Sequence, residues 1–185
     1  MATNLTPTVL TQRLELRPLC PGDATEVRSL AAAREVAATT LRIPHPYPEG
    51  AAEAWIESVS AAMVQGEAVV WAITLRGSGE LVGAVGLEIS TDHARAELGY
   101  WVGVPYWNRG YATEAAAALV EHAFSSLGLN RVFAHYFATN EASGRVMQKL
   151  GMVREGRLRQ HVVKWGERID LELYSVLRAE WDAAH

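Results

Sequence analysis

Hydrophobic and polar positions follow two different periods along the chain. Leucines alternate with charged residues over residues 13–17, which predicts a strand. Residues 69–75 and 81–89 are rich in β-forming side chains, and the Arg-Gly-Ser-Gly-Glu segment between them predicts a hairpin turn. The same reasoning predicts strands over residues 95–103, 131–138, 152–163 and 169–177.

Apolar residues at three- and four-residue spacing predict helices before and between these strands. The first runs from about Asp23, a candidate N-cap, to residue 34. The second covers residues 49–65, and its apolar side is expected to hold Ala54, Trp55, Val59, Ala62 and Met63. Prolines in residues 41–50 exclude helix between the two.

Two further helices lie on either side of the strand at residues 131–138. One covers residues 112–127 and ends before Gly128, and the other starts after Asn140, a good N-cap, and closes at Gly151. A strand, a compact helix and a second strand imply that residues 95–103 and 131–138 run parallel. The N-termini of both helices should therefore meet at one edge of the sheet, where ligands of α/β units bind.

The loop of sequence WNRGYA, residues 107–112, turns the first of these strands directly into a helix. Such a junction leaves backbone N–H groups unpartnered at the positive end of the helix dipole, and a phosphate suits it. An ordinary turn that needs one glycine, Gly110, is the alternative. The glycine alone does not decide between them.

Composition narrows the class of protein. With 185 residues, 49% of them hydrophobic, we expect one domain covering residues 1–185. The first residues have no basic, apolar leader, and no apolar run is long enough to cross a membrane, so we expect a soluble cytoplasmic protein. A net charge of −4 argues against nucleic acid as a partner. Cys20, the single cysteine, is expected to be a buried or incidental thiol, and the six histidines lack ligand spacing, so no metal is expected.

Two motifs resemble one known family. Residues 107–112 resemble the acyl-CoA pyrophosphate loop of the GNAT superfamily of N-acetyltransferases, Gln/Arg-x-x-Gly-x-Gly/Ala, with Trp107 in the first position. That departure is similar to the RimJ/RimL-type branch, the ribosomal-protein-alanine N-acetyltransferase-like proteins. The pattern Asn140-x-x-Ser143 through Lys149-x-Gly151-Met152, followed by Arg-Glu-Gly, resembles the second motif of the same branch.

The resemblance implies a fold and a reaction. The fold is α+β: a mixed, mostly antiparallel twisted sheet with a parallel pair splayed around the CoA site and helices on both faces. The reaction is direct transfer of acetyl from acetyl-CoA to a primary amine, on a protein N-terminus or a small molecule, within a ternary complex. The resemblance also makes a homodimer conceivable.

The same resemblance assigns the residues that hold the coenzyme. The backbone of Val102 and Val104 would pair with the pantetheine arm and polarise the thioester. The pyrophosphate would bind the N–H groups of Arg109, Gly110, Tyr111 and Ala112 and the hydroxyl of Thr113. Asn140 would bond the pantetheine amide region, although helix capping explains it equally well. Arg145 and Lys149 could approach the adenosine 3′-phosphate, although a solvated helix face suits them as well.

Catalytic roles follow from the same comparison. Glu97 is the expected base for the amine, with an ion pair to Arg95 or Arg17 as the structural alternative and Glu88 as the substitute base. Ser143 is the expected acid for the thiolate, because Met147 stands where many GNAT enzymes have a tyrosine.

The acceptor site and the rival functions complete the prediction. Tyr47, Trp55 and His45 would face the acceptor together with Glu88, although core packing explains Trp55 as well. The rival of another class is a non-catalytic acyl-CoA-binding or regulatory module. A serine or cysteine hydrolase is disfavoured, because no Gly-x-Ser-x-Gly elbow occurs and Cys20 has no base beside it.

Overall fold

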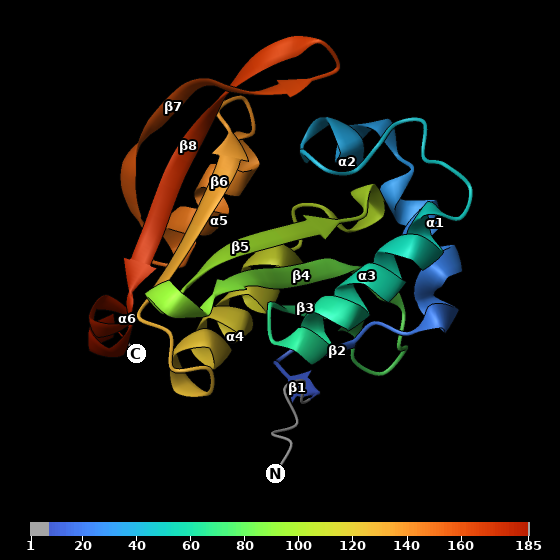
Figure 1. Cartoon of the computed structure of the whole chain (residues 1–185). Helices are drawn as coiled ribbons and strands as arrows, with labels where there is room; N and C mark the ends of the chain where they lie inside the picture. The colour runs from blue at the N-terminus through green and yellow to red at the C-terminus, as the bar shows by residue number, and fades with distance from the viewer. Residues whose placement is uncertain (1–7, 185) are drawn as a thin grey trace.

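One continuous sheet forms the centre of the molecule. The computed structural model describes residues 8–184, so most of the segment in which a leader would lie is outside the described residues. Eight strands in this part of the chain pair in the order β1-β2-β3-β4-β5-β6-β8-β7 (Figure 1). They are β1 Val9–Leu10, β2 Leu14–Pro18, β3 Ala68–Leu75, β4 Leu81–Ser90, β5 Arg95–Val102, β6 Arg131–Phe137, β7 Val153–Lys164 and β8 Glu167–Leu177.

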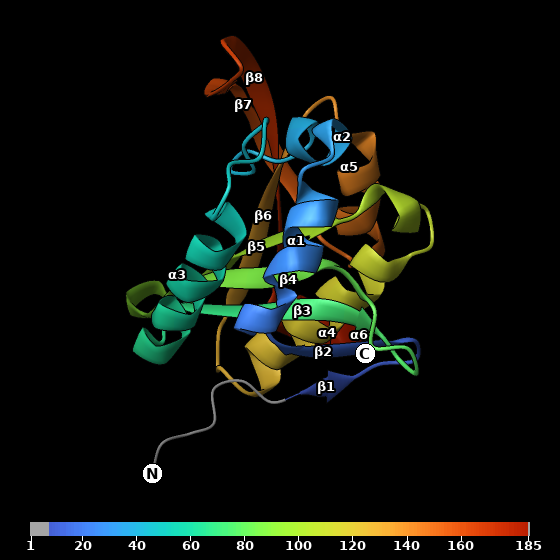
Figure 2. The ribbon, with the colours of Figure 1, turned by 90° about the vertical axis from the view of Figure 1, so that its right-hand side faces the viewer.

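Helices cover both faces of this sheet (Figure 2). They are α1 Ala24–Ala31, α2 Arg34–Ala38, α3 Ala51–Gln65, α4 Tyr111–Ser125, α5 Glu141–Lys149 and α6 Arg178–Ala184. The main apolar core lies between the sheet and α4, α5 and α6, and it includes Leu119, Phe124 and Trp181. A second cluster lies under α1 and α3 on the opposite face. The expected α+β class with helices on both faces is confirmed.

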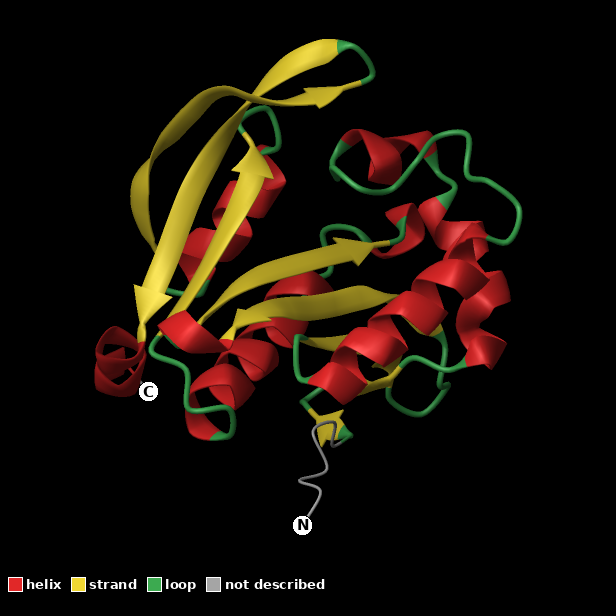
Figure 3. Cartoon of the chain, viewed as in Figure 1, coloured by secondary structure: helices red, strands yellow, loops and turns green. Residues whose placement is uncertain are grey.

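The sheet opens at its only parallel pair among the described strands. β5 and β6 pair in parallel from Arg95 opposite Arg131 to Glu97 opposite Phe133, and all other neighbouring strands are antiparallel. Beyond Glu97 the two strands diverge, and Figure 3 shows the gap that opens between them. We call this gap the fork. The remaining residues of β5, Leu98–Val102, therefore have backbone groups that β6 does not pair.

Local expectations were met in part. Asp23 stands at the N-cap of α1 as expected, but its carboxylate accepts hydrogen bonds from the Arg17 guanidinium and the Cys20 N–H and makes no cap bond. The predicted helix to residue 34 stops at Ala31, and a separate α2 follows. The buried side of α3 is centred on Ala52, Ile56 and Met63, whereas Ala54 is exposed.

Three further observations concern the cysteine, the membrane segment and the metal site that the composition addressed. The Cys20 thiol is exposed rather than buried. Within residues 8–184, no helix has the length and apolarity needed to cross a membrane. The same residues contain no group of three or more metal-binding side chains placed to hold an ion.

Candidate active site

The loop before α4 presents unpartnered donors. Gly110 adopts φ +81°, a left-handed conformation that favours glycine, and it forms the N-cap of α4. The N–H groups of Tyr111, Ala112 and Thr113 donate to no acceptor among the described residues, because the first helical bond is Glu114 N to Gly110 O. Together with the helix dipole, these groups make a site for an anion.

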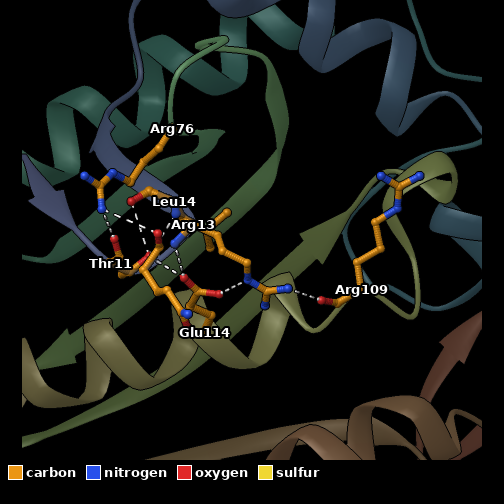
Figure 4. A network of polar contacts seen from close by, with 7 residues as sticks. Thr11, Arg13, Leu14, Arg76, Arg109 and Glu114 are labelled. Carbon is orange, nitrogen blue, oxygen red and sulfur yellow. Dashed lines mark hydrogen bonds and ion pairs between the residues drawn. The ribbon is translucent and has the colours of Figure 1, made fainter.

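A network from the N-terminal strands fixes this loop (Figure 4). The Glu114 carboxylate accepts bonds from the Thr11 hydroxyl at 2.6 Å, the Arg13 N–H at 2.8 Å and the Arg13 Nε at 2.7 Å. Arg13 Nη1 also donates to the Arg109 carbonyl at 2.8 Å. Burial works to raise the pKa of Glu114, but the bonds from Thr11 and Arg13 outweigh it and lower that pKa. Glu114 therefore stays ionised and holds Arg13 against the loop.

A cavity of about 300 Å³ connects the loop to the fork. Its walls come from β5, the loop before α4, the first turn of α4, one side of α5 along its length, and the end of α2 with the residues that follow it. The lining residues include Tyr100, Val102, Gly110, Tyr111, Ala112, Thr113, Asn140, Ser143, Arg145, Lys149, Thr39 and Thr40. Most of the residues predicted to bind the coenzyme are thus brought together around one space.

Val104 departs from its predicted position. β5 ends at Val102, and Val104 begins a short 3₁₀ turn in which its carbonyl accepts the Trp107 N–H at 3.2 Å. The Val102 carbonyl is also occupied, because the Trp107 indole Nε1 donates to it at 2.6 Å. Within the open backbone edge of β5 at the fork, Leu98–Val102, the Val102 carbonyl is thus already bound by a side chain.

A tyrosine and a serine meet inside the cavity. The Tyr100 hydroxyl lies 3.0 Å from Ser143 Oγ, and the Ser143 N–H donates to Asn140 Oδ1 at 3.3 Å, so Asn140 is the N-cap of α5 as predicted. Burial raises the pKa of Tyr100 to about 12, although the bond to Ser143 acts in the opposite direction. Tyr100 therefore remains a phenol at neutral pH. Met147 is 1% exposed within the main core and takes no part in the site.

Glu97 has a partner that was not predicted. Its carboxylate lies 3.0 Å from Nδ1 of His135 on β6, with the two side chains 39% and 22% exposed. Arg17 is bound to Asp23, and Arg95 stacks on Phe133, so the expected ion pair of Glu97 with either arginine is wrong.

Glu88 lies opposite Glu97 in the antiparallel pairing of β4 and β5, which places both carboxylates on one face of the sheet. Glu88 is bound by both terminal nitrogens of Arg42.

The residues predicted to face the acceptor lie on one side of the sheet, away from the cavity. Trp55 contacts Trp101 edge-on, with ring centroids 6.4 Å apart, and both pack with Tyr47 against the second apolar cluster. His45 lies beside Trp165 of the β7–β8 turn. None of Tyr47, Trp55 and His45 lines the 300 Å³ cavity, so any contact with an acceptor would be made outside it.

The β7–β8 hairpin is tied to the loop before α3. Lys164, at the end of β7, is 9% exposed and donates to the carbonyls of Leu41 and Ile43 at 3.2 and 2.8 Å. The Lys164 ammonium and the Arg34 guanidinium each lie over the Trp165 ring, 5.2 and 5.1 Å from its centroid. The loop before α3 is thereby held to the far end of the sheet.

Sequence reasoning missed four features of the site: Tyr100, the Trp107 indole as a hydrogen-bond donor, His135, and the two threonines that follow α2, Thr39 and Thr40. Tyr100 and His135 lie in segments that were identified only as strands, and their neighbours across the fork are distant in sequence. A strict alternation within each strand gives the faces of the side chains but not the register of β5 against β6.

Comparison with known proteins decides the family. A family model described as the acetyltransferase (GNAT) domain matches residues 13–153. The chain belongs to the GNAT family of acetyltransferases. Among relatives of this GNAT chain is p20, an uncharacterized N-acetyltransferase of Bacillus licheniformis, which is 30% identical over 176 residues, 94% of this chain and 98% of p20.

Solved structures agree with this assignment. A GNAT-family acetyltransferase from Bacillus anthracis superposes with a TM-score of 0.80 at 26% identity, covering 94% of this chain and 99% of that one. RimL, a ribosomal L7/L12 alpha-N-protein acetyltransferase solved in complex with coenzyme A, has a TM-score of 0.85 at 17% identity, over 92% and 97% of the two chains. At that identity the likeness to RimL shows the fold.

Proposed function

We propose that this GNAT chain transfers an acetyl group from acetyl-CoA to a primary amine, on a protein N-terminus or on a small molecule. The observation that carries the proposal is the continuous cavity that joins an anion cradle at residues 110–113 to the fork. Family membership and the coenzyme A bound in RimL support the choice of donor.

The residues around the cavity suit each part of the coenzyme. The free N–H groups of Tyr111, Ala112 and Thr113 and the Thr113 hydroxyl suit the pyrophosphate. Arg145 and Lys149 line the same cavity and suit the adenosine 3′-phosphate. The unpaired edge of β5 suits the amides of the pantetheine arm, which would bind there as an added strand does.

The acceptor must lose a proton before it attacks. At pH 7 this costs about 1.4 kcal/mol for an α-amine and about 4.6 kcal/mol for a lysine side chain. A weak base is therefore enough for a protein N-terminus. Glu97 and His135, which meet at the fork, provide the basic groups that the loss of this proton requires.

The leaving sulfur needs a proton, and the Ser143 hydroxyl is our candidate donor. Tyr100 lies behind it at 3.0 Å and can pass a proton through the serine or donate directly. A phenol with its pKa raised to about 12 keeps its proton until the thiolate forms.

Thiol release from acetyl-CoA tests the proposal. Three sets of acceptors are compared. The first is peptides with free N-termini, the second is N-terminally acetylated peptides that contain lysine, and the third is small amines. Amine-dependent release supports an N-acetyltransferase, and the acetylated peptides separate the N-terminal from the lysine amine. Tight binding of acetyl-CoA without release for any amine would instead favour the non-catalytic module. Absence of binding would contradict both.

A further inference from the structure

We infer that the His135 imidazole takes up the proton that the acceptor ammonium loses, and that Glu97 positions this imidazole. The inference rests on the proposed function and assigns a further residue to it. Its basis is the 3.0 Å contact between His135 Nδ1 and the Glu97 carboxylate across the fork.

The position of the pair favours this role. Glu97 is the last residue of β5 that pairs with β6, and His135 follows two residues after Phe133, its partner in register. The two side chains therefore meet where the strands begin to diverge. Glu97 shares its face of β5 with Trp101, which lines the cavity and packs under α3. An amine that reaches the fork from this face meets the pair as it approaches the donor.

The contact also sets the tautomer of the imidazole. A neutral imidazole with its proton on Nδ1 donates to the carboxylate, which leaves the lone pair on Nε2. Nε2 forms no hydrogen bond to any residue in the described part of the chain. It can therefore accept a proton from an ammonium directly or through one water molecule.

The surroundings add no competing partner. Leu173 of β8 lies opposite His135, and Phe133 packs edge-on against the imidazole at 5.6 Å. Among the described charged side chains, Glu88, which pairs in register with Glu97, is bound by Arg42, and the Arg95 and Arg131 guanidiniums stack on Phe133, with Arg131 also bound to Glu155.

The proton balance closes with groups already described. His135 Nε2 takes one proton from the ammonium and later passes it to solvent. The neutral nitrogen forms a bond to the thioester carbon, and the C–S bond breaks with its electron pair on sulfur. The Ser143 and Tyr100 hydroxyls supply one proton to the thiolate, and the second proton lost by the nitrogen replaces it on that pair. The products are an amide, free coenzyme A and one proton.

A structural role is the competing explanation, since the same contact could merely hold the strands together at the fork. The test uses H135Q, H135A and E97Q, with H93Q as the matched control because His93 lies in the exposed turn before β5. The assay is thiol release with an amine on which the wild type acts. Acetyl-CoA binding and thermal melting of each variant are measured alongside.

H135Q should lower kcat/KM about 100-fold near neutral pH, with a smaller loss at alkaline pH, where the amine is already neutral. Acetyl-CoA affinity should stay within about twofold of wild type, and H93Q should be normal. E97Q should lower kcat/KM and change its acid limb, because the carboxylate that holds the Nδ1 proton and orients the imidazole is replaced by an amide. Added imidazole should partly restore H135A, an effect that a structural role would not produce.

A second measurement needs no variant: the His135 imidazole signals in NMR spectra of the wild-type protein should titrate over the pH range of the acid limb. A normal pH profile in H135Q, or titration of the imidazole in a different range, would overturn the inference while leaving acetyl transfer intact. A wild type that releases no thiol with any amine would overturn the proposed function and this inference together.

Discussion

Replacing Gly110 with alanine should weaken acetyl-CoA binding, whereas the same change at Gly128 should not. Both glycines have positive φ, +81° and +67°, and they lie at opposite ends of α4. An alanine in this conformation costs about 1–2 kcal/mol at either position. At Gly128 the added Cβ meets nothing within 4 Å, and at Gly110 it comes 3.2 Å from Arg13 Nη2, the far end of a flexible side chain.

The size of the affinity loss expected for Gly110→Ala depends on whether the free or the bound loop carries the backbone strain. Without ligand the loop can leave the left-handed conformation, and binding of the pyrophosphate must then restore it. The 1–2 kcal/mol therefore reappears as lost affinity, a rise in Kd of about 5- to 30-fold. At Gly128 the same cost affects only the free energy of unfolding, because Gly128 does not line the cavity in which the coenzyme is proposed to bind.

Isothermal titration calorimetry with acetyl-CoA and urea unfolding measure the two effects separately. We expect Gly128→Ala to lose stability but not affinity, and Gly110→Ala to lose affinity with little loss of stability. Equal affinities for Gly110→Ala and wild type, with stability also unchanged, would show that the pyrophosphate does not rest on this loop. A larger change, Gly110→Trp, should abolish binding by filling the cradle.

Three further outcomes are expected. Tyr100→Phe should lower kcat by no more than roughly tenfold with little change in acetyl-CoA KM, because a thiolate leaves readily, and an unchanged kcat in steady-state assays would exclude the phenol. Lys164→Met should raise the acceptor KM but not the acetyl-CoA Kd, because it removes only the hydrogen bonds to the loop before α3. Equal effects on both constants would contradict this. Burial lowers the pKa of His122 in the folded protein. As the pH falls, the unfolded chain therefore takes up a proton on this histidine before the folded chain does. The free energy of unfolding should then decrease by up to about 1.4 kcal/mol per pH unit below the ordinary pKa of 6.5. His122→Leu should remove that slope in urea unfolding measured between pH 7.5 and 5.5, and a slope equal to wild type would show that another group titrates.

Local patterns predicted most elements of this fold. The alternation in β2, the hairpin of β3 and β4, and the capped helix α5 depend on neighbouring residues, and each was confirmed within a few residues. The Asp23 carboxylate is bound by Arg17 rather than by the first turn of α1, and no local pattern signals this contact. No periodicity signals the break at Ala32 that creates α2.

The residues of the candidate site also fall into those that local sequence predicts and those that depend on tertiary contacts. Gly110 and Asn140 were predictable because a tight turn and a helix cap require particular residue types at particular places. His135 was not, because its role depends on the register of β5 against β6 and on where that pairing ends. Trp107 stands at the departure from the general loop motif, and only the structure shows its indole bound to the Val102 carbonyl.

A crystal structure with bound coenzyme A tests the central claim most directly. The account predicts the pyrophosphate on the N–H groups of Tyr111, Ala112 and Thr113, the pantetheine arm along the open edge of β5, and the thiol close to Ser143 and Tyr100. Coenzyme A bound elsewhere on the molecule, with the cavity between β5 and α5 left without ligand, would contradict it.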